Sequence, residues 1–204
     1  MTPSKHSINS ASQNYCIIDN QSNYLKSFKR NFLSEQDFEY LVFDHNQPLV
    51  LPKNAKVQGI ILSGGKGNPY EPLNLTTNFI ALKNYDVPVF GFCLGHEIIA
   101  VLHQGRIHKL GEYQNKKEKV IITKPDDPIF KGFDTKEVML QERHTFEVSH
   151  LPPNFEVLAH SEICKYEIIR HKEKPIYGFQ SHPEVSKPHG IIMIENFLKI
   201  CGLK

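Results

Sequence analysis

The segment Pro88–Ala100 constrains the fold of this chain most, because in it an apolar strand runs into a helix through a very tight turn. The turn reads Gly-Phe-Cys-Leu-Gly over residues 91–95. Its two glycines carry no side chain that would block so close a corner. Such a corner pushes the side chain between the glycines outward, beside the free N–H groups at the start of the helix. The segment therefore predicts an α/β unit with Cys93 presented at the end of a buried strand.

Cys93 occupies the position at which turns of this shape in α/β-hydrolases carry a serine nucleophile. The positive end of the helix dipole favours a thiolate, so we expect a lowered pKa for the Cys93 thiol. A cysteine in an apolar run is also commonly a small core residue without chemistry. The turn alone leaves two interpretations open, a nucleophile and a packing residue.

Strands and helices alternate through the first half of the chain, which is typical of a parallel sheet with helices on both faces. Strands are expected at residues 15–19, 39–43, 57–62 and 87–92, and helices after Ser22, at 76–84 and at 95–104. Ser22 is suited to cap the first helix, in which Leu25, Phe28, Phe32 and Leu33 share one face.

The pattern changes after residue 105. Short strands separated by turns are expected from 106 to 142, for example at 119–123 and 137–140, as antiparallel additions to one side of the sheet. Further strands are expected at 155–160, 166–170 and 175–180, and a closing helix at 189–200.

Length and charge limit the class of protein. At 204 residues, one domain is expected over residues 15–204, after a polar tail at 1–14 that does not resemble a signal peptide. The net charge of +2 gives no support to a nucleic-acid or membrane partner, and no apolar run is long enough to cross a membrane. The four cysteines form no Cys-x-x-Cys pair, so we expect no metal site and a reduced, cytoplasmic setting.

A glycine-rich segment, Ser63–Gly67, follows the third expected strand, at the sheet edge where ligands bind in open α/β folds. It is not a P-loop, because the Gly-x-x-x-x-Gly-Lys-Ser/Thr spacing is absent. Two interpretations remain: a plain turn, or a loop whose N–H groups form an oxyanion hole beside a nucleophile on the neighbouring strand.

His182 and Glu184 follow another expected strand and stand two residues apart. In extended backbone such residues point the same way, so both could address one partner. A carboxylate that orients an imidazole, which exchanges protons with a nucleophile, is what acyl transfer requires. A single His near a Glu is usually a surface residue, but together with Cys93 the pair favours a Cys-His-Glu site.

Five segments in this order resemble the class I, or triad, glutamine amidotransferases, most closely the glutaminase part of GMP synthases. They are Ile17–Asn20, Ile61–Gly65, Pro88–Gly95, Leu151–Phe155 and Tyr177–Glu184, and the match extends from Tyr15 to Lys204. The resemblance implies a flavodoxin-like fold: an open, mostly parallel, twisted sheet with helices on both faces and a small antiparallel addition.

The resemblance also implies roles for five residues. Cys93 corresponds to the nucleophile that attacks the side-chain amide carbon of glutamine, which gives a γ-glutamyl thioester and ammonia. His182 corresponds to the acid-base group and Glu184 to its orienting partner. Gly65 and Leu94 correspond to the backbone donors of the oxyanion hole. No cofactor and no metal are implied.

In this family the ammonia passes to a synthetase domain or subunit. In GMP synthases that partner is an ATP pyrophosphatase, which adenylates xanthosine monophosphate. Because this sequence contains no such domain, we expect a separate glutaminase subunit that serves a synthetase subunit or another ammonia acceptor.

Glu97 departs from the family pattern, in which a glutamine at this position contacts the substrate. An amide both donates and accepts hydrogen bonds, whereas a carboxylate only accepts them. Facing the substrate, Glu97 could hold an α-ammonium group but would repel an α-carboxylate. The alternative is that Glu97 turns to solvent or pairs with a base such as Arg143.

Two other departures concern the walls of the site. Arg143, His144, Thr145 and Phe146 stand where GMP synthases usually have Ser-His-Gly-Asp, in the segment that meets the α-amino-acid end of glutamine. Lys66 replaces a proline of the glycine loop. Glu97, Arg143, His144 and Thr145 are therefore candidate substrate-binding residues. Three hypotheses remain: a glutaminase, a hydrolase or peptidase of another γ-glutamyl compound, and a non-catalytic regulatory subunit that keeps the fold.

Overall fold

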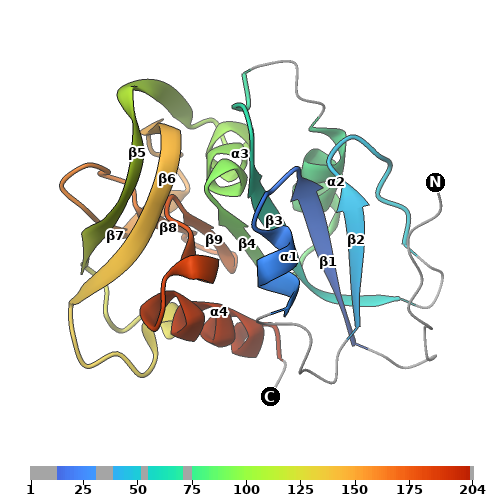
Figure 1. Ribbon diagram of the computed structural model, residues 1–204. Helices are drawn as coiled ribbons and strands as arrows, with labels where there is room; N and C mark the ends of the chain where they lie inside the picture. The colour runs from blue at the N-terminus through green and yellow to red at the C-terminus, as the bar shows by residue number, and fades with distance from the viewer. Residues whose placement is uncertain (1–12, 31–38, 52–54, 71–74, 203–204) are drawn as a thin grey trace.

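One mixed sheet of nine strands organises the part of the protein that the structure describes (Figure 1). The structure is a computed structural model, and it describes residues 13–30, 39–51, 55–70 and 75–202. The strand order is β2-β1-β3-β4-β9-β8-β7-β5-β6. The strands are β1 (Gln13–Asn20), β2 (Glu39–Asp44), β3 (Lys56–Gly65), β4 (Val89–Phe92), β5 (Arg106–Ile122), β6 (Glu137–His150), β7 (Phe155–His160), β8 (Ile168–His171) and β9 (Ile176–Phe179). The helices are α1 (Leu25–Phe28), α2 (Thr76–Asn84), α3 (Leu94–Leu102) and α4 (His189–Ile200), with the 3-10 helices η2 (Pro128–Phe130) and η3 (Pro183–Val185).

The half of the sheet that contains β2, β1, β3, β4 and β9 is parallel. Apolar side chains pack on both of its faces and form two cores. One core joins Phe28 of α1, Phe90 of β4 and Phe197 of α4. The other joins Ile60 of β3 and Ile98 of α3, with α2 beside them. The predicted open α/β sheet with helices on both faces is therefore confirmed.

The other half of the sheet is antiparallel and larger than predicted. β8, β7, β5 and β6 follow β9 in this order, each antiparallel to its neighbour. The prediction of short strands after residue 105 was wrong, because β5 has 17 residues and β6 has 14. Much of this two-stranded ribbon is exposed, and its many charged residues interrupt the apolar alternation by which a strand is recognised in sequence.

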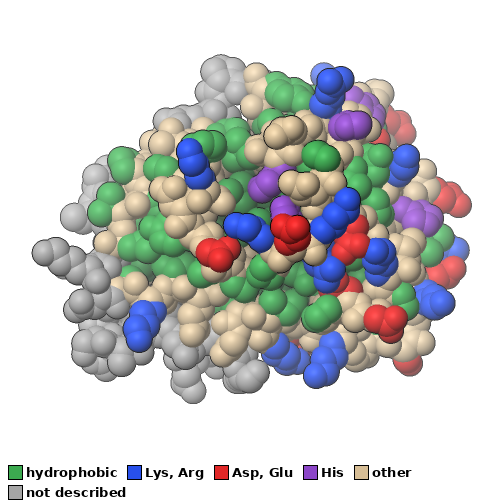
Figure 2. Space-filling view, turned by 180° about the vertical axis from the view of Figure 1, so that it is seen from behind, with side chains coloured by type: hydrophobic (Ala, Val, Ile, Leu, Met, Phe, Trp, Pro, Cys, Tyr) green, Lys and Arg blue, Asp and Glu red, His purple; other side chains and the backbone are tan. Residues whose placement is uncertain are grey.

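Charged side chains on the β5–β6 ribbon are paired with charges of opposite sign. The Nζ atom of Lys116 lies 2.9 Å from Oε2 of Glu118, and Nζ of Lys119 lies 3.5 Å from Oε1 of Glu137 on the facing strand. Figure 2, which shows the molecule from behind, has basic and acidic side chains interspersed on this side. These two ion pairs neutralise part of the charge on the ribbon.

The corner between β4 and α3 has no room for side chains at its two glycines. A Cβ atom on Gly91 would lie 2.6 Å from Cδ1 of Ile99, and one on Gly95 would lie 2.2 Å from the carbonyl oxygen of Leu62. Between them Cys93 has φ 51° and ψ −113°, a conformation that L-residues rarely adopt. The predicted strand-turn-helix unit is confirmed, with the helix beginning one residue earlier than expected.

Most other boundaries agree closely with the sequence prediction. α2, β7 and α4 begin and end at the expected residues. β1 starts at Gln13, inside the expected tail, and the earlier residues of that tail lie outside the described ranges. Within the described ranges, no helix is long and apolar enough to cross a membrane.

The first helix begins later than its prediction from Ser22. α1 begins at Leu25, and the Oγ atom of Ser22 accepts a hydrogen bond from the N–H of Tyr24, ahead of the helix, at 3.1 Å. Ser22 therefore shapes the turn and does not cap the helix. Phe32 and Leu33, expected on its apolar face, lie outside the described residues.

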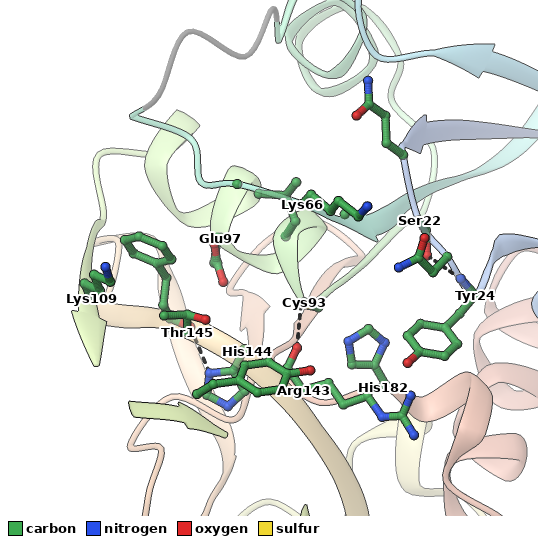
Figure 3. A pocket seen from close by; sticks show the side chains of 17 residues that line it. Ser22, Tyr24, Lys66, Cys93, Glu97, Lys109, Arg143, His144, Thr145 and His182 are labelled. Atoms are coloured by element: carbon green, nitrogen blue, oxygen red, sulfur yellow. Dashed lines mark hydrogen bonds between the residues drawn. The ribbon is translucent and has the colours of Figure 1, made fainter. Parts of the chain in front are cut away.

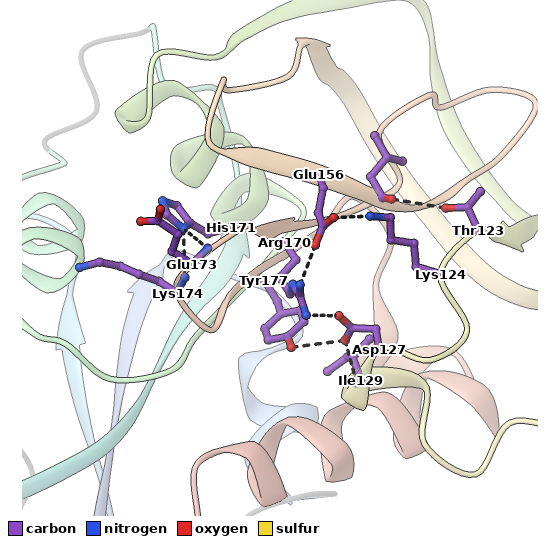
Figure 4. Close-up of polar contacts among 11 residues, drawn as sticks. Thr123, Lys124, Asp127, Ile129, Glu156, Arg170, His171, Glu173, Lys174 and Tyr177 are labelled. Carbon is purple, nitrogen blue, oxygen red and sulfur yellow. Dashed lines mark hydrogen bonds and ion pairs between the residues drawn. The ribbon is translucent and has the colours of Figure 1, made fainter.

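An ion network joins β8, β9 and η2 on the antiparallel side (Figure 4). The guanidinium of Arg170 places one nitrogen 2.6 Å from Oδ2 of Asp127 and another 2.6 Å from Oε1 of Glu156. Tyr177 donates its hydroxyl to Asp127 at 3.3 Å, and the N–H of Ile129 donates to the same carboxylate at 3.0 Å. The Asp127 side chain is 3% exposed, so these donors take the place of the water that burial excludes.

Replacing Arg170 with methionine is expected to lower the free energy of unfolding by about 2 kcal/mol, because it leaves the Asp127 carboxylate with neutral donors only. Urea unfolding followed by circular dichroism measures the change. Lys119→Met is the matched control, since both members of its ion pair with Glu137 are exposed, and we expect it to cost no more than about 0.5 kcal/mol. Equal losses in the two variants would contradict this role of Arg170.

Candidate active site

A cavity of about 400 Å³ lies at the carboxyl ends of the parallel strands, beside the start of α3 (Figure 3). It is lined by the turn after β1, the end of β3, the β4–α3 corner, the β5–β6 ribbon and the residues after β9. All of the site residues predicted from the sequence except Glu184 contribute to this lining: Gly65, Cys93, Leu94, Glu97, Arg143, His144, Thr145 and His182.

The Cys93 thiol and the His182 imidazole meet beside Gly64. A Cβ atom on Gly64 would lie 3.4 Å from Cβ of Cys93 and 3.3 Å from Cε1 of His182, and each of the two side chains shifts the pKa of the other. Nδ1 of His182 lies 2.7 Å from Oε1 of the fully buried Glu184. Because a carboxylate only accepts, Nδ1 carries a proton and Nε2 is free to exchange one with the sulfur.

The His182–Glu184 pair forms on a tightly turned backbone. Glu184 lies in η3, which starts at Pro183, and His182 precedes it with φ −106° and ψ 82°. The prediction that the two side chains lie along an extended segment was therefore wrong, although they do interact. The His182 N–H donates to the carbonyl oxygen of Gln141 at 2.9 Å, and Ser186 Oγ donates to the carbonyl oxygen of His182 at 2.7 Å. The first bond ties the turn that carries the imidazole to β6, and the second closes that turn.

Burial controls the protonation of the thiol. It raises the pKa of Cys93, while the hydrogen bond and charge of His182 oppose this rise. Burial also lowers the pKa of His182, but the sulfur and the Glu184 carboxylate outweigh it, and the pKa lies well above its usual value. The expectation of a lowered thiol pKa was wrong, because Cys93 is 6% exposed and burial is the largest effect on its pKa. The thiolate therefore depends on His182 as its proton acceptor.

Gly65 at the end of β3 packs against Leu94 at the start of α3. A Cβ atom on Gly65 would lie 2.8 Å from Cδ2 of Leu94 and 1.9 Å from the carbonyl oxygen of Asn20. The N–H of Leu94 is among the first of the helix, so it has no acceptor within the helix. Ser63 Oγ accepts from the Asn20 N–H at 2.9 Å, which anchors the strand before Gly65. The segment continues β3 and is not a plain turn.

Glu97 lies in the first turn of α3, with its carboxyl group in the cavity wall. It is 3% exposed, and its Oε1 accepts a hydrogen bond from Nε2 of Gln180 at 3.3 Å. Burial raises the pKa of Glu97 to about 8, against the opposing effects of Gln180 and His182. The alternatives of a solvent-exposed Glu97 and of a Glu97–Arg143 pair are therefore wrong. Glu97 is mostly an uncharged acid at neutral pH.

Arg143 packs on an aromatic ring instead. Its guanidinium carbon lies 4.8 Å from the ring centroid of Tyr24, and that ring lies edge-on to the His182 imidazole, with centroids 5.2 Å apart. The carbonyl oxygen of Arg143 accepts a long hydrogen bond, 3.7 Å, from the Cys93 thiol. Arg143 therefore contacts the Cys93 thiol through its carbonyl oxygen and packs on Tyr24, which in turn contacts His182.

His144 and Thr145 of β6 complete this wall, with Lys66 after β3 and Lys109 of β5 on the same cavity. Nδ1 of His144 donates to the carbonyl oxygen of Phe146 at 2.9 Å. Burial lowers the pKa of His144, so its ring is neutral near pH 7. Within the described residues, no group of three or more His, Cys, Asp or Glu side chains is arranged to hold a metal ion.

Sequence reasoning missed four residues of this region. Gln180 stands two residues before His182 and was given no role, although its place at the end of a strand could have identified it. Tyr24 follows a turn, and no local pattern signals its contacts with Arg143 and His182. The buried acids Glu142 and Glu167 are isolated in the sequence and meet only in the fold.

Known proteins are similar in sequence to nearly the whole of this chain. The family model described as Glutamine amidotransferase class-I matches residues 16–201. A glutamine-hydrolyzing GMP synthase subunit from Pyrococcus abyssi is 40% identical over 191 residues, which cover 91% of this chain and 97% of that protein. The protein of the same name from Methanocaldococcus jannaschii is 36% identical over 191 residues, with 92% and 97% covered.

Solved structures agree with the fold. A crystal structure described as that of a GMP synthase subunit from Thermoplasma acidophilum has a TM-score of 0.79 and 25% identity, and the match covers 94% of this chain and 95% of that one. A glutamine amidotransferase from Thermotoga maritima has a TM-score of 0.70 at 15% identity over 95% and 87% of the two chains, which supports the fold alone. The chain belongs to the class-I glutamine amidotransferase family.

Proposed function

We propose that this protein hydrolyses the side-chain amide of glutamine to glutamate and ammonia through a thioester on Cys93. The contact chain from Cys93 through His182 to Glu184, inside a cavity of suitable size, is the observation that carries this proposal. The positive φ of Cys93 holds its sulfur toward His182 at the end of β4.

The reaction follows from the roles of these groups. His182 takes the thiol proton, and the sulfur attacks the amide carbon of glutamine. The N–H groups of Gly65 and Leu94 stabilise the oxygen on which negative charge develops. His182 then gives its proton to the leaving nitrogen, which departs as ammonia, and activates the water that hydrolyses the thioester. Glu184 keeps the imidazole oriented through both steps.

The other wall residues recognise the amino-acid end of the substrate. An uncharged Glu97 has an O–H donor and a carbonyl acceptor, as the amide of a glutamine has. Glu97 can therefore donate to the substrate α-carboxylate where an ionised acid would repel it. Arg143, His144 and Thr145 form the facing wall, and Lys66 and Lys109 add positive charge that attracts a carboxylate.

Glutamine binding is expected to weaken as the pH rises through about 8, because the pKa of Glu97 is raised to about 8 and the protonated form is lost above it. The KM for glutamine should rise about tenfold per pH unit above that point, up to the limit set by repulsion. In Glu97→Gln this rise should be absent, since the amide keeps its donor at all pH values. The exposed Glu195→Gln is the control and should follow the wild type. A KM that depends on pH equally in all three proteins would contradict this role of Glu97.

We further propose that the ammonia passes to a separate synthetase, an ATP pyrophosphatase subunit of the kind found in GMP synthases. Relatives that match nearly the whole chain are named as glutamine-hydrolyzing GMP synthase subunits, and this chain covers 97% of two of them. Ammonia release from glutamine is measured with this protein alone and with a candidate synthetase. The two measurements test the hydrolysis of glutamine and the transfer of its ammonia. No release in either mixture, by protein shown to be folded, would refute the glutaminase function.

A second candidate function is hydrolysis of another γ-glutamyl compound by the same thioester chemistry. It is favoured by Glu97 and by the Arg143–Phe146 wall, which differ from the usual family residues. A panel of γ-glutamyl amides distinguishes the candidates, and strict preference for glutamine removes the second. Rapid labelling of Cys93 by a glutamine-like diazo-ketone would exclude a non-catalytic subunit.

A further inference from the structure

Two fully buried carboxyl groups lie behind the cavity wall. Glu142 precedes Arg143 on β6, and Glu167 precedes β8; both are 0% exposed. They lie within hydrogen-bonding reach of each other. The mechanism above assigns neither of them a role.

The hydrogen-bond donors around Glu142 and Glu167 are too few to stabilise two ionised carboxylates. Oε1 of Glu167 accepts from the N–H of Ser181 at 3.1 Å. Among the described residues, Oε2 of Glu167 and both oxygens of Glu142 have no hydrogen-bond donor. Two carboxylates are acceptors only, so their direct contact requires a proton on one of them.

The contact between Glu142 and His144 also requires a proton. Its Nδ1 donates to the carbonyl oxygen of Phe146, which is only an acceptor, so Nδ1 carries the ring proton. Nε2 of the neutral ring is then an acceptor, and it lies 3.1 Å from Oε2 of Glu142. A second proton is needed between these two atoms. Two protons therefore join Glu167, Glu142 and His144.

We propose that Glu142 and Glu167 are positioning residues for glutamine hydrolysis, which act in protonated form by tying the His144 wall to the turn that carries His182. This proposal rests on the proposed glutaminase function. Glu167 accepts through its side chain from Ser181 and through its carbonyl oxygen from the N–H of Gln180, at 2.8 Å. The His182 N–H in turn donates to Gln141, the neighbour of Glu142.

The surroundings of the pair favour the protonated form. Burial raises the pKa of Glu142 to about 7, and burial and the neighbouring Glu142 raise the pKa of Glu167 well above its usual value. The groups that act on the pair from β5, β6 and the adjoining loops are Lys116, Glu118, His144, Cys164 and His182. Lys116, the one lysine among them, is half exposed and bonded to Glu118.

Loss of the Glu142 proton removes the donor between Glu142 and Nε2 of His144, so that an ionised carboxylate faces an acceptor nitrogen at 3.1 Å and the wall that carries His144 separates from the pair. The kcat of the wild type, measured at saturating glutamine, is therefore expected to fall about tenfold between pH 7 and pH 9. In Glu142→Gln the amide can donate to Nε2 of His144 and accept from Glu167, so this fall should be absent. Glu142→Ala should lower kcat at every pH.

Glu137→Gln on the same strand is the matched control, because Glu137 is exposed, and it should keep the wild-type pH profile.

Infrared spectroscopy provides a readout that is independent of activity. At neutral pH the protonated-carboxyl absorption of the wild type and of Glu137→Gln should exceed that of Glu142→Gln, in which only Glu97 and Glu167 contribute to it. A kcat profile of Glu142→Gln that falls as in the wild type, or an unchanged infrared spectrum, would overturn the proposal. Absence of glutamine hydrolysis in the wild type would refute the proposed function, and the infrared result would still decide whether the pair is protonated.

Discussion

The variant Cys93→Ala is expected to lose glutamine hydrolysis by roughly 10,000-fold or more, because the thioester forms on the sulfur that it removes. The fold should persist. The corner around Cys93 is held by the N–H of this residue, which donates to the carbonyl oxygen of Phe179 at 2.7 Å, and by the glycines on either side. Ammonia release measured over hours gives the residual rate, and circular dichroism reports the fold.

Cys201→Ala is the matched control for this variant. Cys201 is also buried, but it follows α4 and does not line the cavity. We expect its rate to lie within about twofold of the wild type. A diazo-ketone analogue of glutamine should label this control and leave Cys93→Ala unlabelled. Hydrolysis by Cys93→Ala at the wild-type rate would show that the reaction does not proceed through this thiol.

The sequence predicts the triad because its members stand in short segments with strong local constraints. Gly91 and Gly95 can be recognised as the ends of a corner, and the structure shows why no larger residue fits. His182 and Glu184 are close enough in sequence that a turn or a strand would bring them together. The type of backbone was predicted wrongly, since Pro183 starts a 3-10 helix between them.

Long-range burial could not be predicted in the same way. The environment of Glu97 depends on Gln180, 83 residues away, and the pKa of Cys93 depends on how completely other segments cover it. Reasoning from neighbouring residues alone predicted that the helix dipole activates the Cys93 thiol. It left open whether Glu97 faces the substrate or turns away from it. The fold places both groups out of water, which makes His182 the proton acceptor for the thiol and leaves Glu97 uncharged.

The parallel half of the fold was predicted well because its strands are buried on both faces and read as apolar runs. β4, for example, is buried at all four positions. β5 and β6 alternate between buried and exposed residues over 17 and 14 positions, and their charged residues resemble turns. The length of such a ribbon is determined by cross-strand pairing, which a single sequence does not display.

Gly65→Ala is expected to lower kcat by about 100-fold to 1,000-fold, the effect of losing one oxyanion donor. The added Cβ atom would lie 1.9 Å from the carbonyl oxygen of Asn20, so the backbone of residue 65 must move. Its N–H then no longer points at the oxygen of the tetrahedral intermediate. Because that oxygen gains its charge only after binding, the KM for glutamine should change much less than kcat.

Gly111→Ala is the control for this last variant, since a Cβ atom at Gly111 would meet no other atom within 4 Å. It should retain the rate and the thermal midpoint of the wild type. Diazo-ketone binding before covalent reaction should be similar in both variants, because Gly65 acts on the charged intermediate. If Gly65→Ala kept a rate like that of Gly111→Ala, the N–H of residue 65 would not belong to the oxyanion hole. An equal loss of kcat and of substrate binding would instead mean that the substitution had deformed the whole cavity.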